Sequence, residues 1–406
     1  MSVSRAGLSG VEQRLADALA ARAGAMRTDL ARHVRIPTGW NHAPGLDEYR
    51  GLLLERVRAL GASVDLVEGD ARPQWLLGRD EGAMLPIAIC RHERGDAKAR
   101  VLIACHLDTV FDPRGDFNDF IESADGATAV GPGVVDMKGG ILVALNALEA
   151  LEEAGVPTAW TLVLTSDEET GSFSSERVLR ETARGHDFGI CTEPALPGGE
   201  LAIERMGSGQ FMVECFGRAS HVGRDFTGGV SAVTALAKAL VRIGEMPEPS
   251  KGRILSVGPL KGGDATNAVP DRASAWGNVR FPTPEVAEEI ASMLDDLTTR
   301  EDAMPRVSVR RAFNRPAKPL IPETESFARL AREAAEALGQ KLPFASTGGV
   351  CDGNILQDAG LPTIDTLGVR GGGLHTPQEW IELRSLPERG ALFAVLLARL
   401  GAGAAG

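Results

Sequence analysis

Apolar residues near the start of the chain recur every three or four positions, which is the spacing of an amphipathic helix. This spacing predicts one helix between Val11 and Val34 and another between Leu46 and Leu60. Farther on, short apolar runs alternate with helical stretches. The runs VLIAC, TLVLTS and DFGICTE occupy residues 101–105, 161–166 and 187–193, and helices are expected at 138–154 and 174–182. This order predicts an α/β fold with a doubly wound, mainly parallel sheet covered by helices.

The pattern changes between residues 197 and 315. This stretch contains five strand-like runs and two helical stretches, the helices at 229–243 and 284–299. Two strand–helix–strand units of this kind predict a smaller α+β domain with a ferredoxin-like arrangement. The doubly wound pattern then resumes, with helices expected at 324–338 and 386–400. The expected organisation is a larger domain formed by residues 1–196 and 316–406, with the smaller domain of residues 197–315 inserted into it.

Charge and composition exclude several classes of protein. The chain has 43 basic and 55 acidic residues, a net charge of −12, and lacks a basic cluster with interleaved aromatic residues. Nucleic acid and membrane are therefore not expected as partners. The first 34 residues mix charged and apolar side chains, and no stretch approaches the ~20 apolar residues of a membrane span. A cytoplasmic protein is expected. The five scattered cysteines form no C-x-x-C pair, so neither a disulfide framework nor a zinc ribbon is indicated.

Acidic residues and histidines follow the expected strands. In sheets of this type, ligands bind beyond the carboxyl ends of the strands, so these side chains are expected in one crevice. Nitrogen and oxygen ligands of this kind suit zinc, and an additional carboxylate can activate water. The pattern therefore predicts a two-metal hydrolase. Its residues are His106 with Asp108 in HLD, Asp136 in GPGVVDMKGG, Glu168 and Glu169 in SDEETGS, Glu193 in CTEP, and His375 in GGGLHTP.

Each of these residues also has a simpler interpretation. His106 and Asp108 could close a strand, Asp136 could cap the helix that follows it, and paired acids are usually solvated. All of these independent explanations would have to hold together, so the joint pattern favours a site. Neighbouring residues do not share a face in a helix or a strand, so one of Glu168 and Glu169 can bind metal while the other acts as a base.

Six segments resemble the di-zinc exopeptidase and deacylase family, which includes bacterial glutamate carboxypeptidase, acetylornithine deacetylase and succinyl-diaminopimelate desuccinylase. They are HLDTVF, GPGVVDMKGG, SDEETGS, CTEP, ASHVG and TGGVCDGN…LGVRGGGLHTPQEWI, and they span residues 100–380. The last is most similar to the glutamate carboxypeptidase branch. The resemblance implies a hydrolase that cleaves an amide bond in a small peptide to release its C-terminal amino acid. The alternative is a deacylase acting on N-acyl amino acids.

The resemblance also implies roles for individual residues. His106, Asp136 and Glu193 would hold one zinc ion, and Asp136, Glu169 and His375 a second, which gives two per subunit. Cobalt or manganese could occupy the same ligands. Glu168 would be the general base, and Asp108 would support His106. A non-catalytic descendant of the family is disfavoured because all of these residues are present. A glutamate at position 193 matches the carboxypeptidases and deacylases, since family aminopeptidases and dipeptidases tend to carry aspartate there.

Residues of the expected insert complete the implied site. By the resemblance, His221 in ASHVG would reach the active site of a partner subunit, which makes a homodimer the functional unit and residues 197–315 its dimerisation domain. Asn267 and Arg280 resemble residues that bind the substrate's C-terminal carboxylate and a neighbouring carbonyl, a task that suits arginine. An ordinary strand-end histidine and a solvent-facing arginine are the simpler interpretations. Arg205 is a weaker candidate for a basic contact. Cys351 lacks an evident histidine partner and is not expected to act as a nucleophile.

Overall fold

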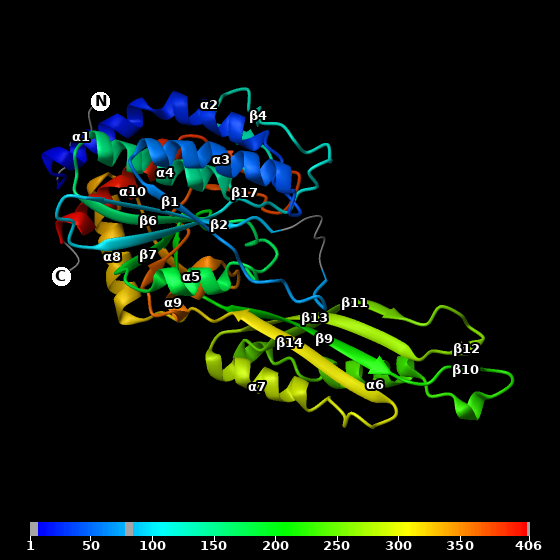
Figure 1. The fold of residues 1–406 in the computed structure, drawn as a ribbon. Coiled ribbons are helices and arrows are strands. Elements are labelled where there is room, and N and C mark those ends of the chain that lie inside the picture. Colours follow the sequence, from blue (N-terminus) through cyan, green and yellow to red (C-terminus); the bar gives the residue numbers. More distant parts are fainter. Residues whose placement is uncertain (1–6, 78–83, 404–406) are drawn as a thin grey trace.

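A six-stranded sheet forms the centre of the larger domain (Figure 1). The computed structural model describes residues 7–77 and 84–403, so residues 1–6 of the N-terminal segment considered above lie outside it. The strand order is β1-β2-β6-β3-β7-β16, in which β6, β3, β7 and β16 are mutually parallel and β2 is antiparallel to both neighbours. The predicted mainly parallel sheet is confirmed. The strand bounds are Ser63–Val67 (β1), Ile87–Arg94 (β2), Arg100–His106 (β3), Thr158–Thr165 (β6), Phe188–Cys191 (β7) and Thr363–Ile364 (β16).

Helices cover both faces of this sheet. Val101, Ile103 and Cys105 of β3 join the core beneath one helical layer, whereas Leu102 and Ala104 join the core on the opposite face. This alternation is the two-residue period of a strand buried on both sides. The first layer contains Gly10–Ala21 (α1), Ala23–Val34 (α2), Ala43–Ala59 (α3), Lys138–Glu153 (α4) and Ser385–Ala402 (α10), with Pro322–Ala337 (α8) beside α10; the second contains Glu176–Ala183 (α5) and Asp352–Asp358 (α9). No described helix is long and apolar enough to cross a bilayer.

The N-terminal helix differs from its prediction. A single helix was expected from Val11 to Val34, but the chain turns at Arg22 and forms α1 and α2. The Arg22 guanidinium is ion-paired with Glu149, at 3.3 Å, and with Glu153, at 2.5 Å, both on α4. The apolar spacing continues through the turn, so the spacing alone could not locate the break.

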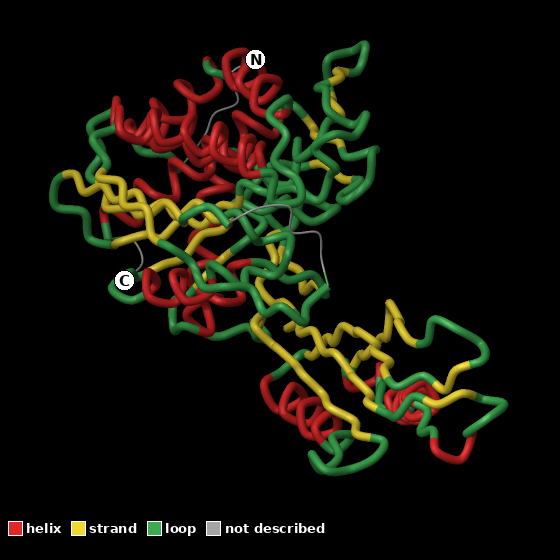
Figure 2. Tube along the Cα trace, turned by 45° about the vertical axis from the view of Figure 1, so that its right-hand side comes forward, coloured by secondary structure: helices red, strands yellow, loops and turns green. Residues whose placement is uncertain are grey.

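The insert has four antiparallel strands in the order β11-β13-β9-β14, with two helices on one face (Figure 2). Along the chain the elements run β9, α6, β11, β13, α7, β14, which is the predicted ferredoxin-like arrangement. The bounds are Gly207–Phe216 (β9), Ala232–Gly244 (α6), Ile254–Gly262 (β11), Arg272–Phe281 (β13), Pro284–Asp295 (α7) and Arg306–Arg315 (β14), with Ser220–His221 (β10), Phe226–Gly228 (η1), Pro249–Lys251 (η2) and Ala268–Val269 (β12) in the connections.

Two chain segments join the insert to the larger domain, and they are bonded to each other. The N–H of Arg205 donates to the oxygen of Lys318 at 2.9 Å, and the N–H of Lys318 donates to the oxygen of Arg205 at 3.0 Å. Both side chains are ion-paired with buried Asp365. Strand β8 (Leu201–Arg205) pairs with β15 (Phe344–Thr347) of the larger domain, so we infer that the insert begins near residue 206 rather than 197.

A small sheet of four short strands lies at the edge of the larger domain, in the order β17-β18-β5-β4. Its loops carry functional candidates, since Asp136 follows β5 and His375 lies between β17 and β18. The sequence pattern did not predict this sheet because its strands are only two or three residues long. They are Ile121–Glu122 (β4), Thr128–Val130 (β5), Gly371–Gly372 (β17) and Trp380–Glu382 (β18).

Candidate metal centre and active-site cleft

Three adjacent parallel strands bring four of the candidate residues to one edge of the central sheet. His106 is the last residue of β3, Glu168 and Glu169 follow β6, and Glu193 follows β7. The strands are hydrogen-bonded in the order β6-β3-β7, so their carboxyl ends are neighbours. The expected gathering in one crevice therefore has a simple topological cause.

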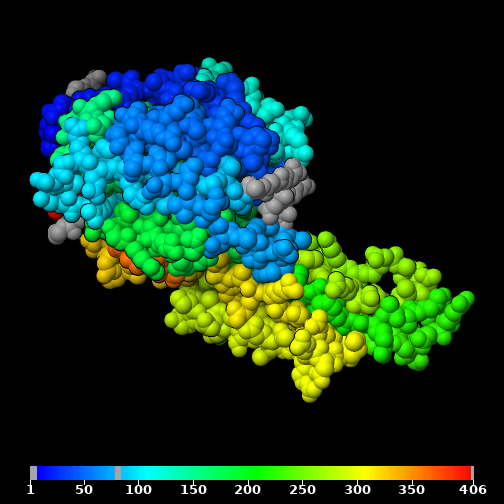
Figure 3. Space-filling model, in the orientation of Figure 1, coloured from blue at the N-terminus to red at the C-terminus, as the bar shows by residue number. Residues whose placement is uncertain are grey.

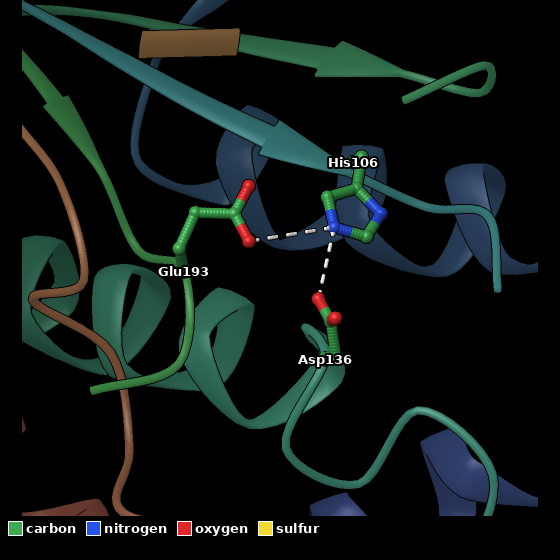
Figure 4. A group of neighbouring side chains, drawn as sticks. All are labelled: His106, Asp136 and Glu193. Atoms are coloured by element: carbon green, nitrogen blue, oxygen red, sulfur yellow. Dashed lines mark hydrogen bonds and ion pairs between the residues drawn. The ribbon is translucent and has the colours of Figure 1, made fainter. Parts of the chain in front are cut away.

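Asp136 is close to His106 and Glu193 in the first group (Figure 4). The Nε2 atom of His106 lies 3.2 Å from Oδ1 of Asp136 and 3.8 Å from Oε2 of Glu193. All three side chains are buried, and each offers a ligand atom within 4.8 Å of the others. One cation can therefore contact all three.

The second group shares Asp136 with the first. Nε2 of His375 lies 3.2 Å from Oε2 of Glu169 and 3.6 Å from Oδ2 of Asp136. The two carboxylate oxygens of Asp136 thus face different groups, Oδ1 toward His106 and Oδ2 toward His375. This is the arrangement that a carboxylate bridging two cations requires.

The chemistry of these groups fits divalent cations. Hydrogen bonds to Asp136 and then Glu169 raise the pKa of His375 to about 11. Burial and then the charge of Asp136 raise the pKa of Glu169 to about 7. Both shifts reflect negative charge crowded into a buried space, which metal ions would neutralise. Imidazole nitrogens and carboxylate oxygens are ligands that zinc accepts.

Asp108 links the histidine ligand to the acidic pair. Its backbone oxygen lies 3.0 Å from Nδ1 of His106, so that nitrogen carries a hydrogen when Nε2 is the ligand atom. Its carboxylate accepts hydrogen bonds from the N–H groups of Glu168, at 3.3 Å, and Glu169, at 2.9 Å. Asp108 therefore orients both a candidate ligand and the turn that carries the candidate base.

Glu168 faces the cleft and is paired with an arginine that the sequence did not single out. Nη1 of Arg315 donates to its Oε1 at 2.8 Å, and Nη2 donates to its backbone oxygen at 2.9 Å. Arg315 is itself held by Ser172, at 2.6 Å, and by Asp352, at 3.5 Å. Burial raises the pKa of Glu168 well above its usual range, although the charge of Arg315 opposes the rise. A raised pKa suits a group that both accepts and returns a proton.

Buried Glu379 holds the loop that carries Asp136. Its carboxylate accepts hydrogen bonds from the backbone N–H groups of Gly133 (3.1 Å), Val135 (2.9 Å) and Asp136 (3.1 Å). Burial, and then the neighbouring Asp136 charge, raises the pKa of Glu379 to about 8, while these N–H groups oppose the rise. Supporting contacts of this kind usually fix ligand orientation.

Replacing Glu379 with glutamine should weaken metal retention by about 10- to 100-fold, because an amide has a single acceptor oxygen for three N–H donors. Metal content after dialysis against graded chelator concentrations, measured by mass spectrometry, tests this. Glu382→Gln is the matched control, since Glu382 is bonded to Arg370 and not to the Asp136 loop. Equal metal retention in the two variants would show that Glu379 does not position the loop.

The two groups line a cleft of about 530 Å³ between the larger domain and the insert. Four arginines also line it, and they differ in what they contact. Arg72 donates to the backbone oxygen of Leu77. Arg315 is bonded to Glu168, and Arg205 is bonded to Asp365 and to the backbone oxygen of Gly349. Half-buried Arg280 has no hydrogen-bond partner for Nη1 among the described residues, and burial and Arg315 lower its pKa. An anionic group in the cleft would satisfy Arg280.

His221 and Asn267 lie away from this cleft. Both are at the far tip of the insert, where β10 pairs with β12 and the N–H of Val222 donates to the oxygen of Asn267 at 3.0 Å (Figure 1). Both side chains are exposed, and neither lines the cleft of its own chain. Within one chain the structure therefore unites the metal-binding candidates with Glu168, Asp108 and Arg280, but not with these two residues.

Arg315 and Glu379 are the supporting residues that the sequence analysis missed. Arg315 ends an insert strand in a run of arginines, and only the fold brings it to Glu168. Glu379 follows His375 by four positions, and this closeness to an expected ligand was the one feature of the sequence that could have indicated a supporting role.

Comparisons with known proteins now bear on this geometry. The family model described as Peptidase family M20/M25/M40 matches residues 102–399. The chain belongs to this family. The family resemblance predicted from the motifs is thus confirmed, and this M20 family protein is a hydrolase of a metal-dependent family.

Relatives of known function are similar over most of the M20 chain. It is 27% identical over 382 residues to carboxypeptidase G2 of Pseudomonas sp. (strain RS-16), covering 92% of this chain and 89% of that protein. It is 28% identical over 295 residues to the succinyl-diaminopimelate desuccinylase of Methylorubrum populi, covering 66% of this chain and 73% of that protein.

Solved structures share the fold. A tripeptidase from Staphylococcus aureus superposes with a TM-score of 0.75 at 21% identity, covering 94% of this chain and 99% of that one. An M20 family metallo-carboxypeptidase from Sulfolobus solfataricus gives a TM-score of 0.68 at 16% identity, covering 93% of this chain and 99% of that one.

Proposed function

We propose that the protein is a di-zinc carboxypeptidase that hydrolyses an amide bond and releases a C-terminal amino acid. The observation that carries the proposal is the pair of three-residue groups sharing Asp136, with Glu168 beside them and Arg280 in the same cleft. The similarity to carboxypeptidase G2 extends along nearly the whole chain and supports this choice.

Each residue would have a separate task. His106, Asp136 and Glu193 would hold one zinc ion, and Asp136, Glu169 and His375 the other. Bound zinc would lower the pKa of coordinated water and polarise the amide carbonyl.

Residues around the metal site would handle the proton and the substrate. Glu168 would accept a proton from the attacking water and return it to the leaving amine, with Arg315 holding its carboxylate in place. Asp108 would keep His106 and the acidic turn aligned. Arg280 would bind the substrate's carboxylate, since it lines the cleft and its Nη1 has no protein acceptor among the described residues.

A homodimer would supply the two residues that lie away from the cleft. Val233 and Val241 on α6 are 40% and 65% exposed, and Ile254 and Leu260 on the edge strand β11 are 40% and 59% exposed. An exposed apolar surface beside an unpaired strand edge supports self-association. We propose that His221 and Asn267 of each subunit then act in the cleft of its partner.

A substrate panel on zinc-loaded enzyme tests the proposed activity. We expect release of a C-terminal amino acid from N-acylated peptides, with kcat/KM at least about 100-fold above that for N-acetyl and N-succinyl amino acids whose acyl group is the part removed. The opposite preference would assign the chain to the deacylases, which the desuccinylase relatives make the second candidate. Addition of chelator should remove either activity.

A further inference from the structure

The open face of the insert's sheet continues outward beyond the cleft. Odd-numbered residues of β9 from Phe211 to Cys215 are buried beneath α6 and α7, so the even-numbered residues face the other side. Near the junction, Gln210 and its cross-strand neighbour Asn278 line the cleft. One step farther along the same face, Met212 and its neighbour Trp276 line a second hollow of about 660 Å³, which we call the outer groove.

The outer groove is positively charged in an acidic protein. Four positive charges against one negative charge leave a net charge of +3 there, whereas the whole chain carries −12. Like charges repel one another, and such a concentration on one face is typical of a surface that attracts an anion. The charged residues are Lys261, Arg272, Arg306, Arg310 and Glu214.

Aromatic rings fix three of the cations in place. Phe216 lies directly across from Arg272 on one side and Arg306 on the other, with guanidinium-to-ring distances of 5.2 and 4.0 Å. The ammonium group of Lys261 lies 5.6 Å from the ring centre of Trp276. A guanidinium stacked on a ring keeps its N–H donors available at its edge, where they can bind a carboxylate in pairs.

A segment of the larger domain connects the groove to the cleft. Residues 74–77, in the loop after β1, line the outer groove, and Nε1 of Trp276 donates to the backbone oxygen of Trp75 at 2.6 Å. This part of the loop, blue in Figure 3, rests against the insert. Leu77 of this loop lines both hollows, so a ligand leaving the cleft along the sheet would pass it to enter the groove.

We propose that the outer groove binds the acidic, acyl-side end of an extended substrate whose scissile amide lies in the cleft. This inference rests on the proposed carboxypeptidase activity, because release of one C-terminal residue leaves only the acyl side to project. Continuity with the cleft and the excess of fixed cations both argue for that occupant. A neutral tail would gain little from four cations.

Three substrates with the same scissile bond and the preferred C-terminal residue test the groove. One is short, one carries three additional glutamates on the acyl side, and one carries three glutamines. Reversing two charges, in Arg272→Glu with Arg306→Glu, should raise KM for the glutamate substrate by about tenfold or more, because repulsion replaces attraction. The kcat for the glutamate substrate should stay within about twofold of the wild-type value. The KM and kcat for the short and glutamine substrates should also stay within about twofold of their wild-type values. The matched control is Arg300→Glu, since Arg300 is exposed and paired with Asp302 outside the groove.

Different failures are distinguishable. Equal KM values for the glutamate and glutamine substrates in the wild type, or no change in the double variant, would overturn the groove assignment while leaving the activity intact. Absence of cleavage for every substrate would overturn the proposed function instead. Calorimetric measurement of glutamate-peptide binding to the wild type and to the double variant would then test the groove alone. A change of oligomeric state in the double variant, or loss of binding to a single-stranded oligonucleotide only, would assign the charges to another occupant and also overturn the proposal.

Discussion

Replacing Glu168 with alanine will lower kcat by roughly 10³-fold or more, since general-base catalysis supplies an acceleration of that order. The change leaves every residue of the two metal-binding groups in place, so about two zinc ions should remain bound per chain. Stopped assays at saturating substrate, with metal content measured on the same samples, test both statements. Loss of metal together with activity would make Glu168 a structural residue rather than the base.

A second variant is needed in that experiment, because Glu168 also accepts a hydrogen bond from Arg315. Alanine at position 168 leaves its guanidinium buried beside Ser172 and Asp352 with one acceptor removed, which costs stability. Glu168→Gln keeps an oxygen for Arg315 but cannot take a proton at neutral pH, so it should be as inactive as alanine and closer to wild type in thermal stability. Glu181→Gln, on an exposed face beside Arg177, is the matched control. If the glutamine variant keeps more than about a tenth of wild-type kcat, a group other than Glu168 accepts the proton of the attacking water.

Two inactive variants should regain activity when they share a dimer. His221→Ala would deprive the partner's cleft of its histidine, and Asp136→Ala would remove the carboxylate shared by both metal-binding groups. In a hybrid dimer, the intact metal site of the first subunit would receive His221 from the second. With random pairing of equal amounts, half the dimers are hybrids with one working site of two, so specific activity should reach about a quarter of wild type.

Co-expression with two different affinity tags allows the hybrids to be isolated and assayed. The matched control combines Asp136→Ala with Glu168→Ala, because both changes affect the cleft of their own chain and no hybrid site is complete. Recovery in that control would point to reversion or to contaminating wild type. Full activity in His221→Ala alone, or no recovery in its hybrids, would refute a site shared between subunits.

The sequence predicted those features that depend on local pattern. Apolar runs and the three- to four-residue helical period located many of the strands and helices of both domains, and polar residues directly after strands located the edge where ligand-type side chains meet. The closeness of His106, Glu168, Glu169 and Glu193 follows from the parallel sheet that the alternating pattern predicted, because its strands place their carboxyl ends side by side. The sharing of Asp136 between two groups was implied by the family resemblance alone, since Asp136 follows a strand of the small sheet that the pattern did not predict.

Contacts between segments far apart in the sequence were beyond such reasoning. Arg315 reaches Glu168 across 147 positions, and Glu379 reaches Asp136 across 243, and neither residue stands out in its own segment. At the turn between α1 and α2, the side chain of Arg22 is ion-paired with acids of α4, which are more than 120 positions away in the sequence. The inferred junction near residue 206 rests on the pairing of β8 with β15, whose partners are about 140 residues apart.

The paired backbone hydrogen bonds between Arg205 and Lys318 lie where the insert joins the larger domain, and a rotation of the insert would pivot there. Strand β9 has 10 residues and therefore extends about 33 Å from that point, so each ten degrees of rotation would move its outer end by about 6 Å. Arg315 lies three positions from Lys318 and would therefore move only about a third as far as the outer end of β9. His221 and Asn267 lie at the far tip of the insert and would move the farthest. A small rotation would thus leave the Arg315–Glu168 pair nearly in place while it carried His221 and Asn267 over a much larger distance.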